Sequence, residues 1–155
     1  MTTMDTTTGD PLQQVQYLLD QDKPQDALDY LNHQCNGKTC FHNARAVCQM
    51  RLGNASQAVR ILRPLVYPDG AGKSPADQPL YQANLAAALM AEGRLVAANI
   101  VLKQVREKAH PAVRNVRDVL DAWKKTLGPG ERFVFWLGVE LGIPCPLPVR
   151  PGSLA

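Results

Sequence analysis

The feature that most constrains the fold of this chain is a spaced pattern of small and large apolar residues that occurs twice. Both copies run alanine, glycine, alanine, leucine, with spacings of seven, five and four residues. They are Ala46, Gly53, Ala58 and Leu62, and Ala86, Gly93, Ala98 and Leu102. Alanines let two helices approach closely, and glycine permits a tight turn between them. The pattern therefore predicts a repeated helix hairpin.

Helix starts and stops are marked along most of the chain, and apolar residues between them recur at the 3.6-residue period of an α-helix. Asp10-Pro11 and Lys23-Pro24 place proline at a first helical position. Thr39 and Asn54 are capping residues. Pro64 is expected to kink or stop the fourth helix near its end.

Eight helices are expected, and the scarcity of aromatic residues, 6% of the chain, also favours an all-α fold over a sheet. Irregular structure is expected at 67–79 and in the proline-rich stretch after 141. The helices are predicted at 10–22, from 23 through Leu31, 39–53, from 54 through Leu65, 80–92, between Gly93 and His110, 111–127 and 131–141.

The repeated pattern resembles the tetratricopeptide repeat (TPR), which has a small residue midway in its first helix and a glycine at the turn. The first two helices fit it more loosely, with Val15, Asp22, Ala27 and Leu31 at the corresponding places. His42 and Gln82 stand where the family has an aromatic residue. Gly53 and Gly93 are 40 residues apart instead of about 34, and the 67–79 loop absorbs the excess.

The resemblance covers residues 10–127 as about three degenerate repeats, with the seventh helix as the solvating cap. It implies an all-α fold in which antiparallel helix hairpins form a right-handed superhelical array. Residues 1–9 are expected to be a disordered N-terminus, and 128–155 a short apolar helix followed by a proline-rich tail.

The resemblance also implies a concave wall, lined by the first helix of each repeat, where a partner binds. Only Asn43, Arg51 and Asn84 could serve as polar clamps there. The rest of the wall is apolar and includes two methionines, which suits an apolar or amphipathic segment. For each wall residue, a place in the core between helices is the alternative. The wall residues are Leu12, Gln16, Leu19, Asn43, Val47, Met50, Arg51, Leu80, Asn84, Ala87 and Met90.

An aromatic segment near the end of the chain is the second exceptional feature. Phe133, Phe135 and Trp136 lie within four residues and are followed by Leu137. The segment is expected to cap the end of the array by burying these rings. Alternatively it folds back into the groove, or into that of a second protomer to give a homodimer. Membrane contact is not expected, because only Arg132 supplies a positive charge beside it.

A small group of cysteine and histidine residues is a weak candidate for a metal site. His33, Cys35, Cys40 and His42 have the ligand types that zinc prefers. Structural zinc sites usually have closer cysteine pairs, so neither a metal nor another cofactor is expected. Cys48 falls on an apolar helix face and is expected in the core.

Composition and motifs exclude several other classes of function. The net charge of +3 is too small to predict nucleic-acid binding. No signal peptide and no apolar run of about 20 residues is present, so a cytoplasmic location without membrane insertion is expected. Gly72-Lys73-Ser74 lacks the earlier glycine and the preceding strand of a phosphate-binding loop. An enzyme is not expected.

The predicted function is therefore a protein–protein interaction module that binds a polypeptide segment in the concave groove, as an adaptor or chaperone-like scaffold. The alternative is a structural subunit that docks into a larger assembly through the Phe/Trp-rich segment. A small zinc-binding helical protein is the third interpretation.

Overall fold

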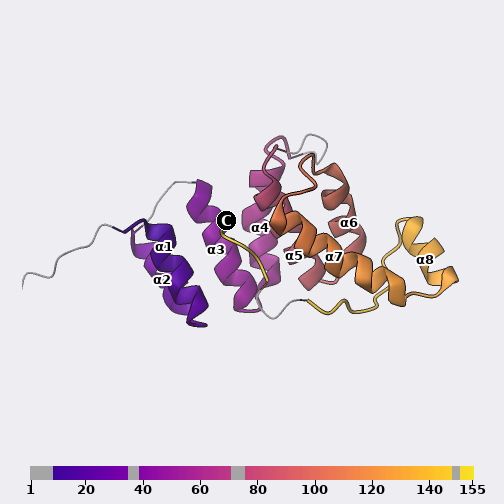
Figure 1. Cartoon of the computed structure of the whole chain (residues 1–155), viewed down its shortest axis with the longest axis horizontal. Coiled ribbons are helices and arrows are strands. Elements are labelled where there is room, and N and C mark those ends of the chain that lie inside the picture. The colour runs from indigo at the N-terminus through magenta and orange to yellow at the C-terminus, as the bar shows by residue number, and fades with distance from the viewer. Residues whose placement is uncertain (1–8, 35–38, 71–75, 148–150) are drawn as a thin grey trace, which may run out of the picture.

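The computed structural model describes residues 9–34, 39–70, 76–147 and 151–155, which form eight α-helices and no β-strand (Figure 1). The all-α prediction is thus confirmed for this part of the chain. The helices are α1 (Pro11–Asp20), α2 (Pro24–Gln34), α3 (Thr39–Arg51), α4 (Ala55–Val66), α5 (Pro79–Ala91), α6 (Leu95–Gln104), α7 (Pro111–Thr126) and α8 (Pro129–Trp136).

Most helix starts follow the local signals in the sequence. The Asp10 carboxylate accepts a hydrogen bond of 3.1 Å from the Leu12 N–H, as a capping residue should. Asn54 occupies the capping position of α4, but its side chain donates to Gln49 Oε1 instead. Pro64 does not stop α4, which continues to Val66.

Two helices end earlier than their apolar pattern predicts. α6 ends at Gln104 instead of His110, because Val105 takes an extended conformation that buries its side chain while the chain turns toward α7. α8 begins at Pro129, where Glu131 accepts the Gly128 N–H, and ends at Trp136 instead of residue 141. Gly138, at φ +87°, takes the left-handed conformation that terminates helices.

The three hairpins α1–α2, α3–α4 and α5–α6 turn in the same way. Each turn has one residue of positive φ, which is Asp22 (57°), Gly53 (81°) or Gly93 (80°). In each, this residue's N–H donates to the carbonyl three residues back, and the next N–H donates five residues back. This is the Schellman arrangement that closes a helix end. Asp22 therefore performs the turn that glycine performs in the other two hairpins.

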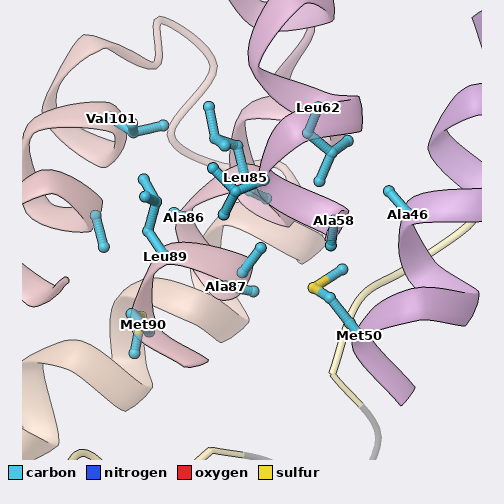
Figure 2. Close-up of a cluster of buried hydrophobic side chains, with 14 of the residues drawn as sticks. Ala46, Met50, Ala58, Leu62, Leu85, Ala86, Ala87, Leu89, Met90 and Val101 are labelled. Atoms are coloured by element: carbon cyan, nitrogen blue, oxygen red, sulfur yellow. The ribbon is translucent and has the colours of Figure 1, made fainter. Parts of the chain in front are cut away.

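The residues of the repeated pattern form the contacts between helices. Except for the turn residues, every member of the pattern is buried, with at most 3% of its surface exposed. The buried set is Val15, Ala27 and Leu31, Ala46, Ala58 and Leu62, and Ala86, Ala98 and Leu102. Several of them belong to the buried cluster drawn in Figure 2.

The helices pack in chain order along the long axis of the molecule (Figure 1). Each of α1 to α6 contacts the next helix, and α1, α3, α5 and α7 also contact one another in succession. α5 lies at the centre of this arrangement, because it packs against α3, α4, α6 and α7. Its residues from Gln82 to Met90 are accordingly all buried.

The chain after α7 is fixed to the helices at two points. Phe135 of α8 packs edge-on against Trp123 of α7, with ring centroids 5.2 Å apart. Glu140 then accepts hydrogen bonds from the N–H groups of Leu95 and Val96 at 3.0 and 2.7 Å. A carboxylate is favoured at this position, since the first N–H groups of α6 have no partner within the helix.

From Glu140 the chain runs back along the helices toward α3 (Figure 1). Exposure alternates along residues 141–147. Leu141, Ile143, Cys145 and Leu147 pack against the core, whereas Gly142, Pro144 and Pro146 are exposed. This period of two is that of an extended chain with one face buried. The segment is therefore a strap laid along the helix stack, although it forms no regular element.

The left-handed residues at the turns lead to a prediction about the stability of the fold. Gly93→Ala should lower the free energy of unfolding by about 1 kcal/mol, because an L-residue is strained in the left-handed region. A Cβ there would meet nothing within 4 Å, so the loss is conformational and not steric. Urea unfolding followed by circular dichroism measures it.

Gly130→Ala is the matched control for the turn variant. Gly130 lies inside α8 without a positive φ and also has open space around it. Alanine should be neutral or stabilising there, since it is the better helix former. An unchanged unfolding midpoint for Gly93→Ala would contradict this account of the turns.

Candidate functional site

The candidate site is the surface of α3 and α5 on which residues 151–155, here called the closing segment, lie. We call this surface the groove, and its residues are Asn43, Val47 and Met50 of α3 and Asn84, Ala87 and Met90 of α5. The closing segment comes close to α3 in Figure 1, and it passes beside Met50 in Figure 2.

Asn84 binds both main-chain polar groups of a single residue, Ser153. Its Oδ1 accepts the Ser153 N–H at 2.9 Å, and its Nδ2 donates to the Ser153 carbonyl at 2.7 Å. The side-chain amide thus pairs with the extended chain as a neighbouring strand would. Since a backbone N–H can only donate, the Ser153 N–H also fixes which way the Asn84 amide faces.

Asn43 completes the arrangement from the neighbouring helix. Its Oδ1 accepts the second Nδ2 hydrogen of Asn84 at 2.8 Å, and its own Nδ2 donates to the Ser153 carbonyl at 3.3 Å. The two asparagines are only 2% and 1% exposed. Burying an amide without partners is unfavourable, so the main chain of Ser153 supplies bonds that the groove needs.

The side chain of Ser153 is not recognised by the asparagines. The Ser153 hydroxyl donates instead to the Ala155 carbonyl of the same segment at 2.5 Å. The Asn43–Asn84 pair therefore reads the main chain of an occupant, and this type of recognition tolerates different side chains at that position.

Gly152 brings the closing segment nearer to α3 than a larger residue would allow. A Cβ on this residue would lie 2.6 Å from Met50 Cε and 3.2 and 3.3 Å from the two methyl groups of Val47. Gly152 also has φ +87°, in the region that only glycine enters readily.

A cavity of about 360 Å³ remains beside the closing segment. Ala87 and Met90 of α5 line one side of it, and Ala112, Val116 and Val119 of α7 line another. Gly152 and Ser153 border the cavity without filling it, because their side chains are small. The groove thus holds an extended main chain next to an unfilled, largely apolar space.

The structure brings together about half of the predicted wall. Asn43, Val47, Met50 and Asn84 contact the closing segment, and Ala87 and Met90 line the cavity next to it. Met50 and Met90 are at most 5% exposed, so they belong to the core and to the groove floor at once.

The other predicted wall residues contribute to contacts elsewhere in the fold. Arg51 donates to the Leu19 carbonyl at 3.2 Å and so joins α3 to α1. Gln16 donates to the Asp20 carboxylate on its own helix. Leu12 and Leu80 are half-buried against the core, where they help to hold the helices together.

The predicted docking segment is divided between a buried anchor and exposed rings. Phe135 is buried against Trp123, whereas Phe133, Trp136 and Leu137 are 58%, 75% and 57% exposed. Phe133 and Trp136 stack on each other with ring centroids 5.9 Å apart. α8 therefore packs on the end of the helix stack, and the segment that enters the groove is a different one.

The surroundings of these exposed rings are more basic than the sequence suggests. A hollow of about 460 Å³ beside Trp136 is lined by Lys103, Lys124 and Lys125 in addition to Arg132. The expectation that only Arg132 accompanies the aromatic segment is therefore wrong. α6 and α7 supply the other three charges through the fold, and linear spacing does not reveal them.

The cysteine and histidine group lies partly outside the described residues, since Cys35 and the side chain of Cys40 are not among them. Within the described part of the chain, no group of three or more possible ligands is placed to hold a metal ion. His33 Nδ1 instead lies 2.7 Å from the Asp29 carbonyl. Cys48 is fully buried as expected, and burial raises the pKa of its thiol to about 11.

Sequence reasoning missed the occupant of the groove and the contribution of α7. The closing segment lies 110 residues from Asn43 and 69 from Asn84, so no local pattern connects them. The signal that could have found its path is the alternation of apolar residues with glycine and proline at 141–147. The resemblance predicts only a capping role for α7, yet this helix forms one side of the cavity.

Comparisons with protein-family models, with curated proteins and with solved structures give no match to this chain. In the described residues, no helix has both the length and the apolar character required to span a bilayer.

The Asn43–Asn84 pair that binds the main chain of Ser153, here called the clamp, leads to a prediction about the closing segment. Asn84→Ala should release it, because the variant leaves the Ser153 N–H and carbonyl and the Asn43 amide without their main partner. Amide hydrogen exchange of Ser153, measured by NMR, should rise toward the rate of an unstructured peptide. Asn54→Ala should not change it, since that side chain donates to Gln49 at the α3–α4 turn. Slow Ser153 exchange in both variants would rule out the clamp.

Proposed function

We propose that this chain is a TPR-like polypeptide-binding module, an adaptor or chaperone-like scaffold that holds an extended segment of a partner protein in the groove. The observation that carries the proposal is the bonding of Asn84 to both main-chain groups of Ser153, with 2.9 and 2.7 Å distances. A surface that already holds an extended segment of protein has the geometry to hold another.

The repeated construction of the fold supports the TPR-like part of the proposal. Three hairpins share one turn geometry, with the left-handed residue at 22, 53 and 93. Helices α1, α3, α5 and α7 contact one another in succession, so each first helix lies beside the next. Arrays built in this way present a continuous wall of first helices as a binding surface.

The chemistry of the groove supports a polypeptide as the ligand. Asn43 and Asn84 provide donors and an acceptor at the spacing of the N–H and carbonyl of one extended residue. Val47 and Met50 lie beside the neighbouring glycine, and Met90 lines the adjoining cavity. Main-chain hydrogen bonds give affinity to such complexes, and neighbouring pockets give specificity. The cavity beside α7 is the pocket that is available here.

A second candidate function rests on the exposed rings of α8. Trp136, Phe133 and Leu137 are each more than half exposed, together with Val139 and Ile100 nearby in the fold. Apolar side chains that gather at one end of a molecule are typical of a docking surface. Through this surface the chain would be a structural subunit of a larger assembly or of a homodimer.

Selection from a random peptide library tests the groove. The target is the full chain carrying Gly152→Val and Ser153→Pro, here called the open variant, in which the closing segment cannot re-form its contacts. Peptides enriched on the open variant should bind at least about tenfold more weakly when Asn84→Ala is added, because two main-chain hydrogen bonds are lost. Fluorescence anisotropy of the enriched peptides gives the affinities.

Trp136→Ala in the open variant distinguishes the two candidate functions. Trp136 lies on α8, away from the groove, so peptides held by Asn84 should bind this variant with unchanged affinity. Peptides that lose affinity with Trp136→Ala but not with Asn84→Ala would support the structural-subunit alternative. Circular dichroism of each variant verifies that the helices are intact.

A further inference from the structure

We propose that the groove selects segments in which a glycine precedes the clamped residue, and that the closing segment is a built-in occupant which such a partner must displace. This inference rests on the proposed polypeptide-binding function and specifies its ligand. The ligand class is an extended protein segment of the type X-Gly-X, in which the residue after glycine is held by its main chain.

The first reason is the backbone conformation that the groove imposes before the clamp. Gly152 has φ +87°, whereas the adjoining Ser153 is held by Asn84 as an extended chain. L-residues other than glycine are strained at this φ. An occupant that follows the same path to Asn84 therefore requires glycine at that one position.

The second reason is the space at the same position. A Cβ would come within 2.6 Å of Met50 Cε, and within 3.3 Å of both Val47 methyl groups. Met50 can move the end of its flexible side chain, but Val47 is β-branched, and its side chain has one strongly preferred rotamer in a helix. α3 thus disfavours any side chain at the position of Gly152, whereas the position of Ser153 accepts one.

The selectivity for glycine applies to one position of the ligand, because the positions of Gly152 and Ser153 differ in what they allow. At the position of Ser153 the asparagines bind only main-chain groups, and the hydroxyl bonds within the segment itself. Substitution there leaves the contacts to the groove in place. A single position in the ligand, the one that Gly152 fills, carries the discrimination.

The closing segment also competes with any partner of this type. It occupies the same asparagine pair and the same surface of α3. A segment joined to its own binding site is present at a high effective concentration, which a separate partner has to exceed. A partner binds the wild-type chain more weakly than it binds the open variant for this reason.

Three synthetic peptides test the inference on the open variant. They are acetyl-Pro-Gly-Ser-Leu-Ala, the same peptide with alanine for glycine, and the same peptide with alanine for serine as the matched control. The readout is the shift of the Asn43 and Asn84 side-chain amide signals in ¹⁵N NMR spectra during titration. The glycine-to-alanine peptide should bind about tenfold more weakly, and the serine-to-alanine peptide within about twofold of the parent.

The wild-type chain provides a second measurement that does not depend on the open variant. Titration with the parent peptide should require at least about tenfold more peptide, and the Ser153 amide signal should move to its unbound position as the closing segment is displaced. If the open variant does not fold, the comparison of the glycine and alanine peptides on the wild-type chain decides the question.

The outcomes separate this inference from the function on which it rests. Equal binding of the glycine and alanine peptides overturns the selectivity alone. Failure of all three peptides, while library-selected peptides still bind through Asn84, also overturns only this inference. Absence of any Asn84-dependent peptide binding overturns the proposed function together with it.

Discussion

The buried amide of Asn84 is the constraint on which the arrangement of the second half of the chain depends. α5 is buried from Gln82 to Met90, and a polar side chain in the middle of that stretch is unfavourable unless each of its hydrogen-bonding groups has a partner. Asn43 supplies one partner and the main chain of Ser153 supplies the others. The helices alone would leave this amide incompletely bonded, so the groove and its occupant are parts of one structure.

The rest of the C-terminal region brings Ser153 to that amide. Phe135 fixes α8 on Trp123, Glu140 fixes the following turn on the start of α6, and the strap at 141–147 lies with alternate side chains on the core. Proline residues in the strap restrict it to extended conformations and reduce the entropy that is lost when it is ordered. A proline-rich stretch without regular structure is therefore the part of the chain that positions the occupant.

Local patterns in the sequence predicted most of the helices, and the packing of α8 on the end of the array, but not the path of the chain after α8. These patterns are the period of apolar residues, the prolines at helix starts and the glycines at turns, and each acts over a few residues. They predicted all eight helices, but the predicted ends of α6 and α8 differ from those in the structure. Asn43 and Asn84 were predicted as wall residues because both lie on first helices of hairpins. Their partner Ser153 could not be predicted, since the contact joins residues 69 and 110 positions apart.

An occupant made of small residues is suited to being replaced. Gly152 and Ser153 satisfy the asparagine pair, yet they leave the cavity between α5 and α7 unfilled. Filling an apolar cavity contributes roughly 25 cal/mol for each Å² of apolar surface removed from water. A partner segment with the same glycine and a large apolar side chain directed at Ala87 and Val116 would keep the main-chain bonds and add this contribution. Such a gain could offset the advantage that covalent attachment gives to the closing segment.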